Sequence, residues 1–307
     1  MKVQQIEAKE TYTVLKNLQD IEIAPSSVVK SVKDKIAEAL TKKASDIRKR
    51  VVSMITYAQS GHVGGCFSAT DLLTVLYYYK MRINPDNPSW EDRYRFILSK
   101  GHSAPLLYAI LMDLGFLKDH ELLTLRMLGS RLQGHPDMRT TPGVDISSGS
   151  LGMGLSAGCG MAIAAKLDNK DYKVYVMIGD GELQEGQVWE SVMTAVHFHL
   201  DNLIAIVDKN NLQTDAPVKS IMNCGNISDQ FRAFGWNVIE INGHNIREIM
   251  HAYDLADMTR SRPTVIIAET CKGKGVSFME HNPVYHGTPP KWNEATVAVD
   301  EILNGKR

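Results

Sequence analysis

Short apolar runs rich in β-branched residues alternate with longer helical patterns along most of this 307-residue chain, and this alternation constrains the fold more than any other feature. Continuous apolar runs are typical of parallel strands that helices cover on both faces. The sequence therefore predicts an α/β domain with a parallel sheet and helices on both faces. In such sheets, ligands bind beyond the carboxyl ends of the strands.

The chain is expected to divide into an N-terminal helical extension, residues 1–44, and one α/β domain, residues 45–307. The predicted strands are 95–98, 173–178, 203–208, 237–241 and 264–269. The predicted helices are 28–50, 69–80, 104–114, 151–166, 187–199 and 246–258.

Charge and composition exclude several classes of partner. The 34 Lys and Arg residues nearly balance the 35 Asp and Glu residues, so no global field favours nucleic acid or an anionic membrane. No apolar run approaches the ~20 residues that span a bilayer, and the start of the chain lacks a signal-peptide pattern, so a cytoplasmic protein is expected. The four cysteines are far apart, which favours neither a zinc site nor a disulfide framework.

Polar residues follow two of the predicted strands directly. The run Gly179-Asp180-Gly181-Glu182 follows one, and Asn210 with Asn211 follows the next. Gly-Asp-Gly alone is a common turn and Asn-Asn alone a common loop. Together, Asp180, the Asn210 side chain and the Leu212 carbonyl could supply three oxygen ligands to Mg²⁺, with Ca²⁺ or Mn²⁺ as alternatives, and a diphosphate could supply two more. The glycines would let the backbone approach the anion closely.

This constellation resembles the thiamine diphosphate signature, and further motifs, in matching order, resemble the transketolase family. The resemblance covers roughly residues 45–290 and is carried by Ser60-Gly61-His62, Ser99-Lys100-Gly101-His102, Gly134-His135-Pro136, Gly149-Ser150-Leu151-Gly152, Leu183-Gln184-Glu185-Gly186 and Tyr285-His286-Gly287. It implies a thiamine-diphosphate-binding fold and the transfer of a two-carbon ketol unit from a ketose phosphate to an aldose phosphate.

The resemblance places His62, His102, His135 and His286 around the reactive end of the cofactor and the sugar, with His102 and His286 also touching the cofactor. Imidazoles change charge near neutral pH, so such a cluster can bind hydroxyl groups and move protons. For any one of these histidines, the alternative is a structural role at a helix cap or in the core.

Other positions take cofactor roles by the same resemblance. The Gly149 carbonyl would accept a hydrogen bond from the aminopyrimidine, beside Ser150, and Leu151 would pack on the cofactor. Glu185 would act near the seam with a partner domain. Lys272, in a Lys-Gly-Lys-Gly loop, would either reach the diphosphate or be an ordinary surface lysine.

In this family, a glutamate on a separate pyrimidine-binding domain activates the cofactor. The sequence after His286 is too short for another α/β domain. We therefore expect a split transketolase, in which a separate C-terminal subunit completes the active site in an α2β2 assembly.

Two other classes of function stay open from the sequence. Another thiamine diphosphate enzyme, such as a 2-oxo-acid dehydrogenase α subunit or a deoxyxylulose-phosphate synthase relative, is the enzymatic alternative. The cluster of histidines suited to sugar hydroxyls argues against a decarboxylating site. A regulatory or scaffold protein that keeps only the fold is the non-enzymatic alternative.

Overall fold

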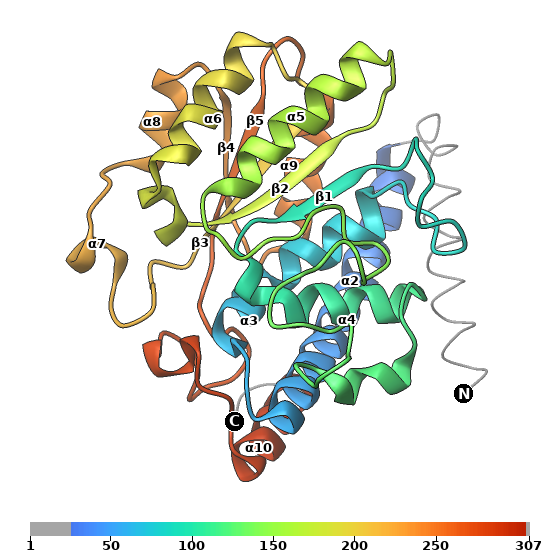
Figure 1. The fold of residues 1–307 in the computed structure, drawn as a ribbon, viewed down its shortest axis with the longest axis vertical. Coiled ribbons are helices and arrows are strands. Elements are labelled where there is room, and N and C mark those ends of the chain that lie inside the picture. The colour runs from blue at the N-terminus through green and yellow to red at the C-terminus, as the bar shows by residue number, and fades with distance from the viewer. Residues whose placement is uncertain (1–25, 305–307) are drawn as a thin grey trace.

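A five-stranded parallel sheet forms the centre of the protein (Figure 1). The computed structural model describes residues 26–304. The strand order is β1-β2-β3-β5-β4. The strands are β1 (Arg95–Leu98), β2 (Val174–Gly179), β3 (Leu203–Lys209), β4 (Asn237–Asn242) and β5 (Thr264–Glu269). The parallel sheet and the five predicted strands are confirmed.

The strand residues alternate between two hydrophobic cores. In β2, for example, Tyr175 and Met177 belong to one core, whereas Val176 and Ile178 belong to the other. All four side chains are fully buried. Helices therefore cover both faces of the sheet, which is why the strands read as unbroken apolar runs. Figure 1 shows α5 and α6 side by side on one face.

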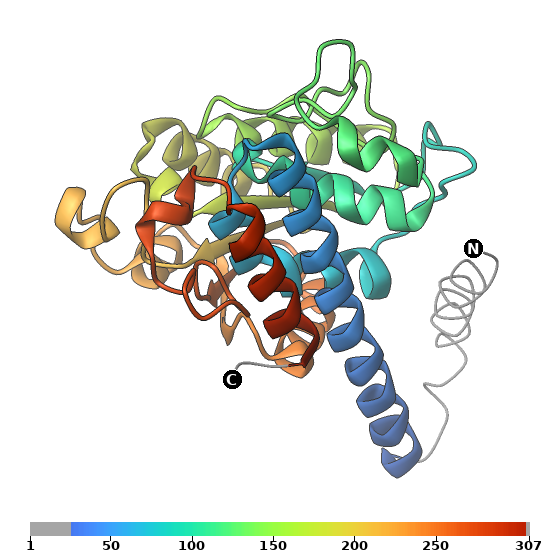
Figure 2. The ribbon, with the colours of Figure 1, turned by 90° about the horizontal axis from the view of Figure 1, so that it is seen from below.

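Nine α-helices lie within residues 26–304. The helices are α2 (Ser26–Ala58), α3 (Val63–Val75), α4 (Ala104–Leu114), α5 (Met153–Leu167), α6 (Gly186–His197), α7 (Val218–Ile221), α8 (Ile227–Ala233), α9 (Ile246–Met258) and α10 (Trp292–Asn304). The long helix α2 extends beyond the body of the protein at its N-terminal end, and α10 packs along it (Figure 2). In the described part of the chain, no helix is long and apolar enough to cross a membrane.

The division of the chain after residue 44 stays a prediction, but that position falls inside α2. Leu40, before it, and Ile47, after it, both lie in the same core. Residues 1–25 of the predicted extension lie outside the described part of the chain.

Several helices differ from the sequence prediction: α2 continues to Ala58 rather than ending at residue 50, and α7 and α8 were not predicted. Helix α3 begins at Val63 rather than residue 69, because Gly64 and Gly65 are helical here instead of forming a loop. Helix α10 was not predicted, although Ala295, Ala298 and Ile302 bury one face of it at helical spacing.

Candidate cofactor and substrate site

Asp180 follows β2, where the strand passes into a short 3-10 helix. Its side chain is 4% exposed. One carboxylate oxygen accepts a hydrogen bond from the backbone N–H of Gly181 at 2.9 Å, and the other accepts one from the N–H of Asn211 at 2.5 Å. Burial, followed by the neighbouring Asp208 carboxylate, raises the pKa of Asp180 to about 6. These surroundings favour a bound cation, because a cation would stabilise the charged carboxylate.

Asn210 and Leu212 lie on the loop after β3. The buried Asn210 side chain accepts a hydrogen bond at Oδ1 from the N–H of Leu212, at 3.1 Å. The Lys272 ammonium donates to the carbonyl oxygens of Leu212 at 3.0 Å and Gln213 at 3.3 Å. Lys272 is only 1% exposed, so the interpretation as a surface lysine is wrong for this residue. The carbonyl oxygens of Leu212 and Gln213 therefore already bind one cationic group, the Lys272 ammonium.

A buried ion pair joins Lys100, which follows β1, to Asp208 near the end of β3. Lys100 donates from Nζ to Asp208 Oδ2 at 2.5 Å and to the carbonyl of Gly65 at 2.8 Å. Ser68 and Thr270 also donate hydroxyl hydrogen bonds to Asp208, which is fully buried. A buried charge needs such compensation. Asp208 has no predicted role in the sequence; a charged residue inside a predicted buried strand was the only signal for it.

Glu182 joins three of the motif segments. Its Oε1 accepts hydrogen bonds from the Ser99 hydroxyl and from the N–H of Gly152, at 2.8 Å for the latter. Its Oε2 accepts one from the N–H of Gly179 at 3.0 Å. Burial raises the pKa of this carboxyl group. Glu182 belongs to the segment predicted to bind the cofactor, and the structure places it as a buried link between the loops of that site.

The predicted aminopyrimidine loop is open to solvent. Gly149, Ser150 and Leu151 are exposed, and Leu151 retains 40% of its accessible surface. Glu185, also exposed, lies against the same loop, because a Cβ atom on Gly152 would come within 2.7 Å of the Glu185 Cβ. These residues lie together on one surface, as a contact with both a cofactor and a partner would require.

Three of the four predicted histidines form a compact triangle. The ring centroids are 5.1 Å apart for His62 and His102, 5.3 Å for His62 and His286, and 5.2 Å for His102 and His286. His62 Nδ1 is buried and has no hydrogen-bond partner within the described chain. His135 is not in the triangle; it lies beside Gly149, where an added Cβ would be 3.3 Å from the His135 ring. The four side chains therefore line one region.

The surroundings keep these imidazoles neutral. Burial is the largest cause in every case, and nearby cationic side chains add to it. The pKa falls to about 4 for His62 and about 3 for His286, and it falls well below the usual value for His102. The pKa of His135 is also lowered. At neutral pH, the uncharged rings can therefore accept hydrogen bonds, whereas pKa values this low make them weak bases.

The residues of this region fit a metal and diphosphate group by their chemistry. Asp180 offers a buried carboxylate, Asn210 an amide oxygen, and Leu212 a carbonyl that already accepts from an ammonium group. Hard cations take this mixture of oxygen donors. Across residues 26–304, no cluster of three or more His, Cys, Asp or Glu side chains is arranged to hold a metal. The expected site does not need such a cluster.

His286 links the histidines to the strand-end loops. Its Nδ1 accepts a hydrogen bond from the Lys272 ammonium, at 2.6 Å. Since Lys272 also holds the carbonyl of Leu212, one side chain spans the two parts of the site. Gly64 makes room for this arrangement, because an added Cβ there would lie 3.0 Å from the Lys272 chain. This packing explains a glycine inside α3.

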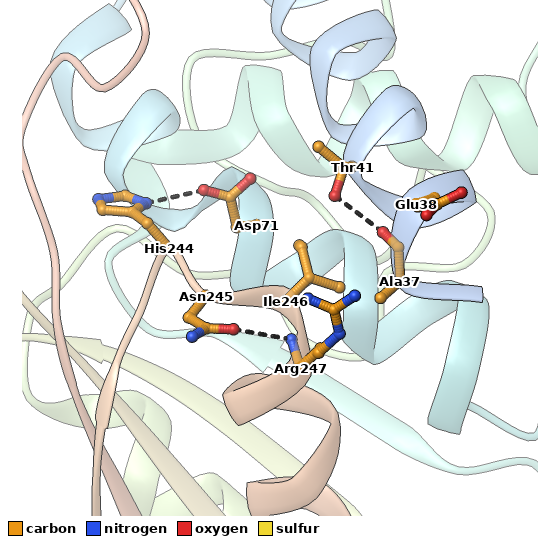
Figure 3. A pocket seen from close by; sticks show the side chains of 8 residues that line it. All are labelled: Ala37, Glu38, Thr41, Asp71, His244, Asn245, Ile246 and Arg247. Atoms are coloured by element: carbon orange, nitrogen blue, oxygen red, sulfur yellow. Dashed lines mark hydrogen bonds and ion pairs between the residues drawn. The ribbon is translucent and has the colours of Figure 1, made fainter. Parts of the chain in front are cut away.

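A separate hollow of about 410 Å³ lies between α2 and the start of α9 (Figure 3). Its lining contains none of the predicted site residues. His244 Nδ1 bonds to the Asp71 carboxylate at 2.7 Å, and His244 Nε2 accepts from the N–H of Cys271 at 2.8 Å. Arg48 also pairs with Asp71. Through the hydrogen bond from the Cys271 N–H to His244, this network fixes the backbone next to Lys272.

Comparisons with known proteins identify the family. Residues 40–302 match the family described as "Transketolase, thiamine diphosphate binding domain". The chain is 41% identical to one subunit of the apulose-4-phosphate transketolase of Phocaeicola vulgatus, over 86% of this chain and 94% of that protein. It is 42% identical to a 6-deoxy-6-sulfo-D-fructose transketolase subunit of Clostridium sp., over 85% of this chain and 96% of that one.

The fold agrees with these sequence matches. The crystal structure of transketolase from Campylobacter jejuni superposes with a TM-score of 0.81 at 35% identity, over 87% of this chain and 43% of that chain. The transketolase interpretation is confirmed and the dehydrogenase alternative is not favoured. The chain belongs to the transketolase family, as a subunit that carries the thiamine diphosphate binding domain.

Proposed function

We propose that this chain holds the diphosphate of thiamine diphosphate through a divalent cation at the ends of β2 and β3. The observation that supports this most directly is the buried Asp180 carboxylate, whose pKa is raised to about 6 and which accepts a hydrogen bond from Asn211, the residue between Asn210 and Leu212. Mg²⁺ is the proposed metal, because it binds phosphates and oxygen ligands together. Lys272 would add a charge-assisted contact to the diphosphate.

The proposed reaction transfers a two-carbon ketol unit from a ketose phosphate to an aldose phosphate. When bound, the cofactor supplies the reactive carbon that breaks and remakes the carbon–carbon bond. The neutral rings of His62, His102 and His286 would bind the sugar hydroxyls by accepting hydrogen bonds from them. His135 and the adjacent Gly149 carbonyl would orient the cofactor and substrate.

A partner chain would complete the site. The related proteins from Phocaeicola vulgatus and Clostridium sp. have names that denote one subunit of a transketolase. The exposed surface around Leu151 and Glu185 is available for such a partner. We propose that a C-terminal subunit carries the activating glutamate, that the assembly is α2β2, and that it works in the cytoplasm.

The donor sugar can be found by assay. The names of the two relatives give apulose 4-phosphate and 6-deoxy-6-sulfo-D-fructose as sugars of those proteins. A donor panel for this chain should contain both of these sugars, xylulose 5-phosphate and a 2-oxo acid. The geometry of the histidines supports sugars over 2-oxo acids, because several hydrogen-bonding groups face one region.

The decisive experiment compares this chain alone, the partner alone and the two together. We expect turnover of a ketose phosphate with ribose 5-phosphate only from the pair, and only with thiamine diphosphate and a divalent metal. Substantial turnover by the lone chain would contradict the two-chain proposal. Cofactor binding without turnover of any donor by the pair would favour a regulatory protein.

A further inference from the structure

Arg126, which has no predicted role in the sequence, lies next to two of the histidine motifs. It follows the 3-10 helix Asp119–Thr124 and has a φ of 61°, which is uncommon for a residue other than glycine. Its backbone N–H donates to the carbonyl of Leu132 at 2.8 Å, which fixes the turn. The arginine is exposed, so its guanidinium remains accessible from solvent.

The guanidinium contacts the segments that carry His62 and His135. Nη1 donates to the Ser60 hydroxyl at 3.1 Å, two residues before His62. On the other side, a Cβ atom on Gly134 would lie 3.0 Å from the Arg126 Cζ and 3.1 Å from Nε. The glycine of the Gly-His-Pro motif thus gives the guanidinium room to lie flat against the backbone beside His135.

No carboxylate within residues 26–304 forms an ion pair with Arg126. By contrast, Arg131, five positions later, is paired with Glu121 at 2.5 Å through Nε and again at 2.7 Å through Nη2. The charge of Arg126 acts on the histidines instead. After burial, it is the largest cause of the lowered pKa of both His62 and His135. An exposed guanidinium beside neutral imidazoles is suited to an oxyanion.

We propose that Arg126 binds the anionic group of the sugar substrate, a phosphate or a sulfonate, so that this chain supplies part of the substrate's charge recognition. The inference rests on the proposed function. A planar guanidinium can donate two parallel hydrogen bonds to a tetrahedral oxyanion, which a histidine cannot do. The Gly134 backbone and Ser60 hold the guanidinium in place, so little side-chain freedom is lost on binding.

The test compares each charged donor with its uncharged analogue in the assembled pair. For Arg126→Met, we expect the KM for xylulose 5-phosphate to rise about tenfold or more, whereas the KM for xylulose itself stays within about twofold. Arg126→Lys should recover part of the loss. Arg131→Met is the matched control, and it should leave the ratio of the two KM values unchanged. A parallel series with 6-deoxy-6-sulfo-D-fructose distinguishes a sulfonate from a phosphate.

Two kinetic outcomes would overturn the inference. An equal rise of both KM values would mean that Arg126 only supports the two motif segments. Unchanged KM values would mean that it contacts neither kind of donor. If the wild-type pair turned over no ketose at all, the proposed function would fail by itself, and the role of Arg126 would then be decided by binding.

The binding experiment uses the full chain labelled in its histidines and titrated with inorganic phosphate. The NMR signals of His62 and His135 should shift in the wild type and in Arg131→Met, and they should stay in place in Arg126→Met. Phosphate shifts that persist in Arg126→Met would overturn the inference, and so would the lack of any shift in the wild type. Potassium chloride at equal ionic strength controls for general screening.

Discussion

Oδ2 of Asp180 lies 2.5 Å from the backbone nitrogen of Asn211, although the two residues are 31 positions apart in the chain. The contact joins the loop after β2 to the loop after β3. These strands are neighbours in the sheet, with Gly179 paired to Asp208. A buried carboxylate thus stands where the two loops meet, as a shared metal and diphosphate site requires.

Asp180→Ala should abolish metal-dependent binding of thiamine diphosphate, because the cation would lose its carboxylate ligand. Calorimetric titration of the assembled pair with cofactor and Mg²⁺ would measure this loss. Asp215→Ala changes an exposed carboxylate in the next loop, so it should bind like the wild type. Unchanged affinity in Asp180→Ala would refute the assignment of this metal ligand.

Lys272→Met should weaken cofactor binding by roughly tenfold or more, since a charge-assisted contact would be lost. It should also destabilise the chain by about 1–3 kcal/mol, because the carbonyls of Leu212 and Gln213 would lose their buried donor. Lys274→Met is the control, since that side chain is 38% exposed. Equal effects of the two variants in calorimetry and urea unfolding would contradict this role.

The pKa of His62 should make stability depend on pH below neutrality. The pKa is about 4 in the folded chain and about 6.5 in the unfolded one, so the unfolded chain binds more protons between these values. The free energy of unfolding should therefore fall as pH is lowered from 6.5 to 4. His62→Gln should make that fall shallower in urea unfolding. NMR of the wild type should find a His62 midpoint near 4, and a midpoint near 6.5 would disprove the prediction.

Glu182→Ala should destabilise the chain by at least ~3 kcal/mol. Three donors, the Ser99 hydroxyl and the N–H groups of Gly152 and Gly179, would lose their buried acceptor, at about 1 kcal/mol or more each. Urea unfolding measures this change. Glu190→Ala, an exposed change on α6, should stay within about 0.5 kcal/mol of the wild type. A loss in Glu182→Ala no larger than in this control would argue against the link.

Much of this fold could be predicted because parallel strands leave a clear pattern. The fully buried run from Val174 to Ile178 has no polar alternate face, and a run of this kind bounded by turn residues is typical of a buried strand. The segments that supply the site could be predicted because they follow such strands. The resemblance then added His62, His102 and His286, which lie far apart in the sequence and meet only in three dimensions.

Tertiary contacts explain what could not be predicted. Gly64 and Gly65 are typical of a loop, yet they lie in helix α3, and an added Cβ would come within 3.0 Å of the Lys272 chain at Gly64 and 3.2 Å of the Ser103 hydroxyl at Gly65. The link through Glu182 depends on three segments that only the folded chain brings together. Arg126 is an ordinary arginine in the sequence, and only its contacts with Ser60 and Gly134 set it apart.

The hydrogen bond from Lys272 to His286 has a thermodynamic consequence. A bound anion that attracts the Lys272 ammonium group would also change the hydrogen bond from Lys272 to the His286 ring. The affinity for the sugar near His286 then depends on whether the cofactor is bound near Lys272. Thermodynamic linkage requires this effect to be equal in both directions. Cofactor and sugar should therefore each alter the binding of the other by the same factor, and replacing Lys272 with methionine should make the two affinities independent.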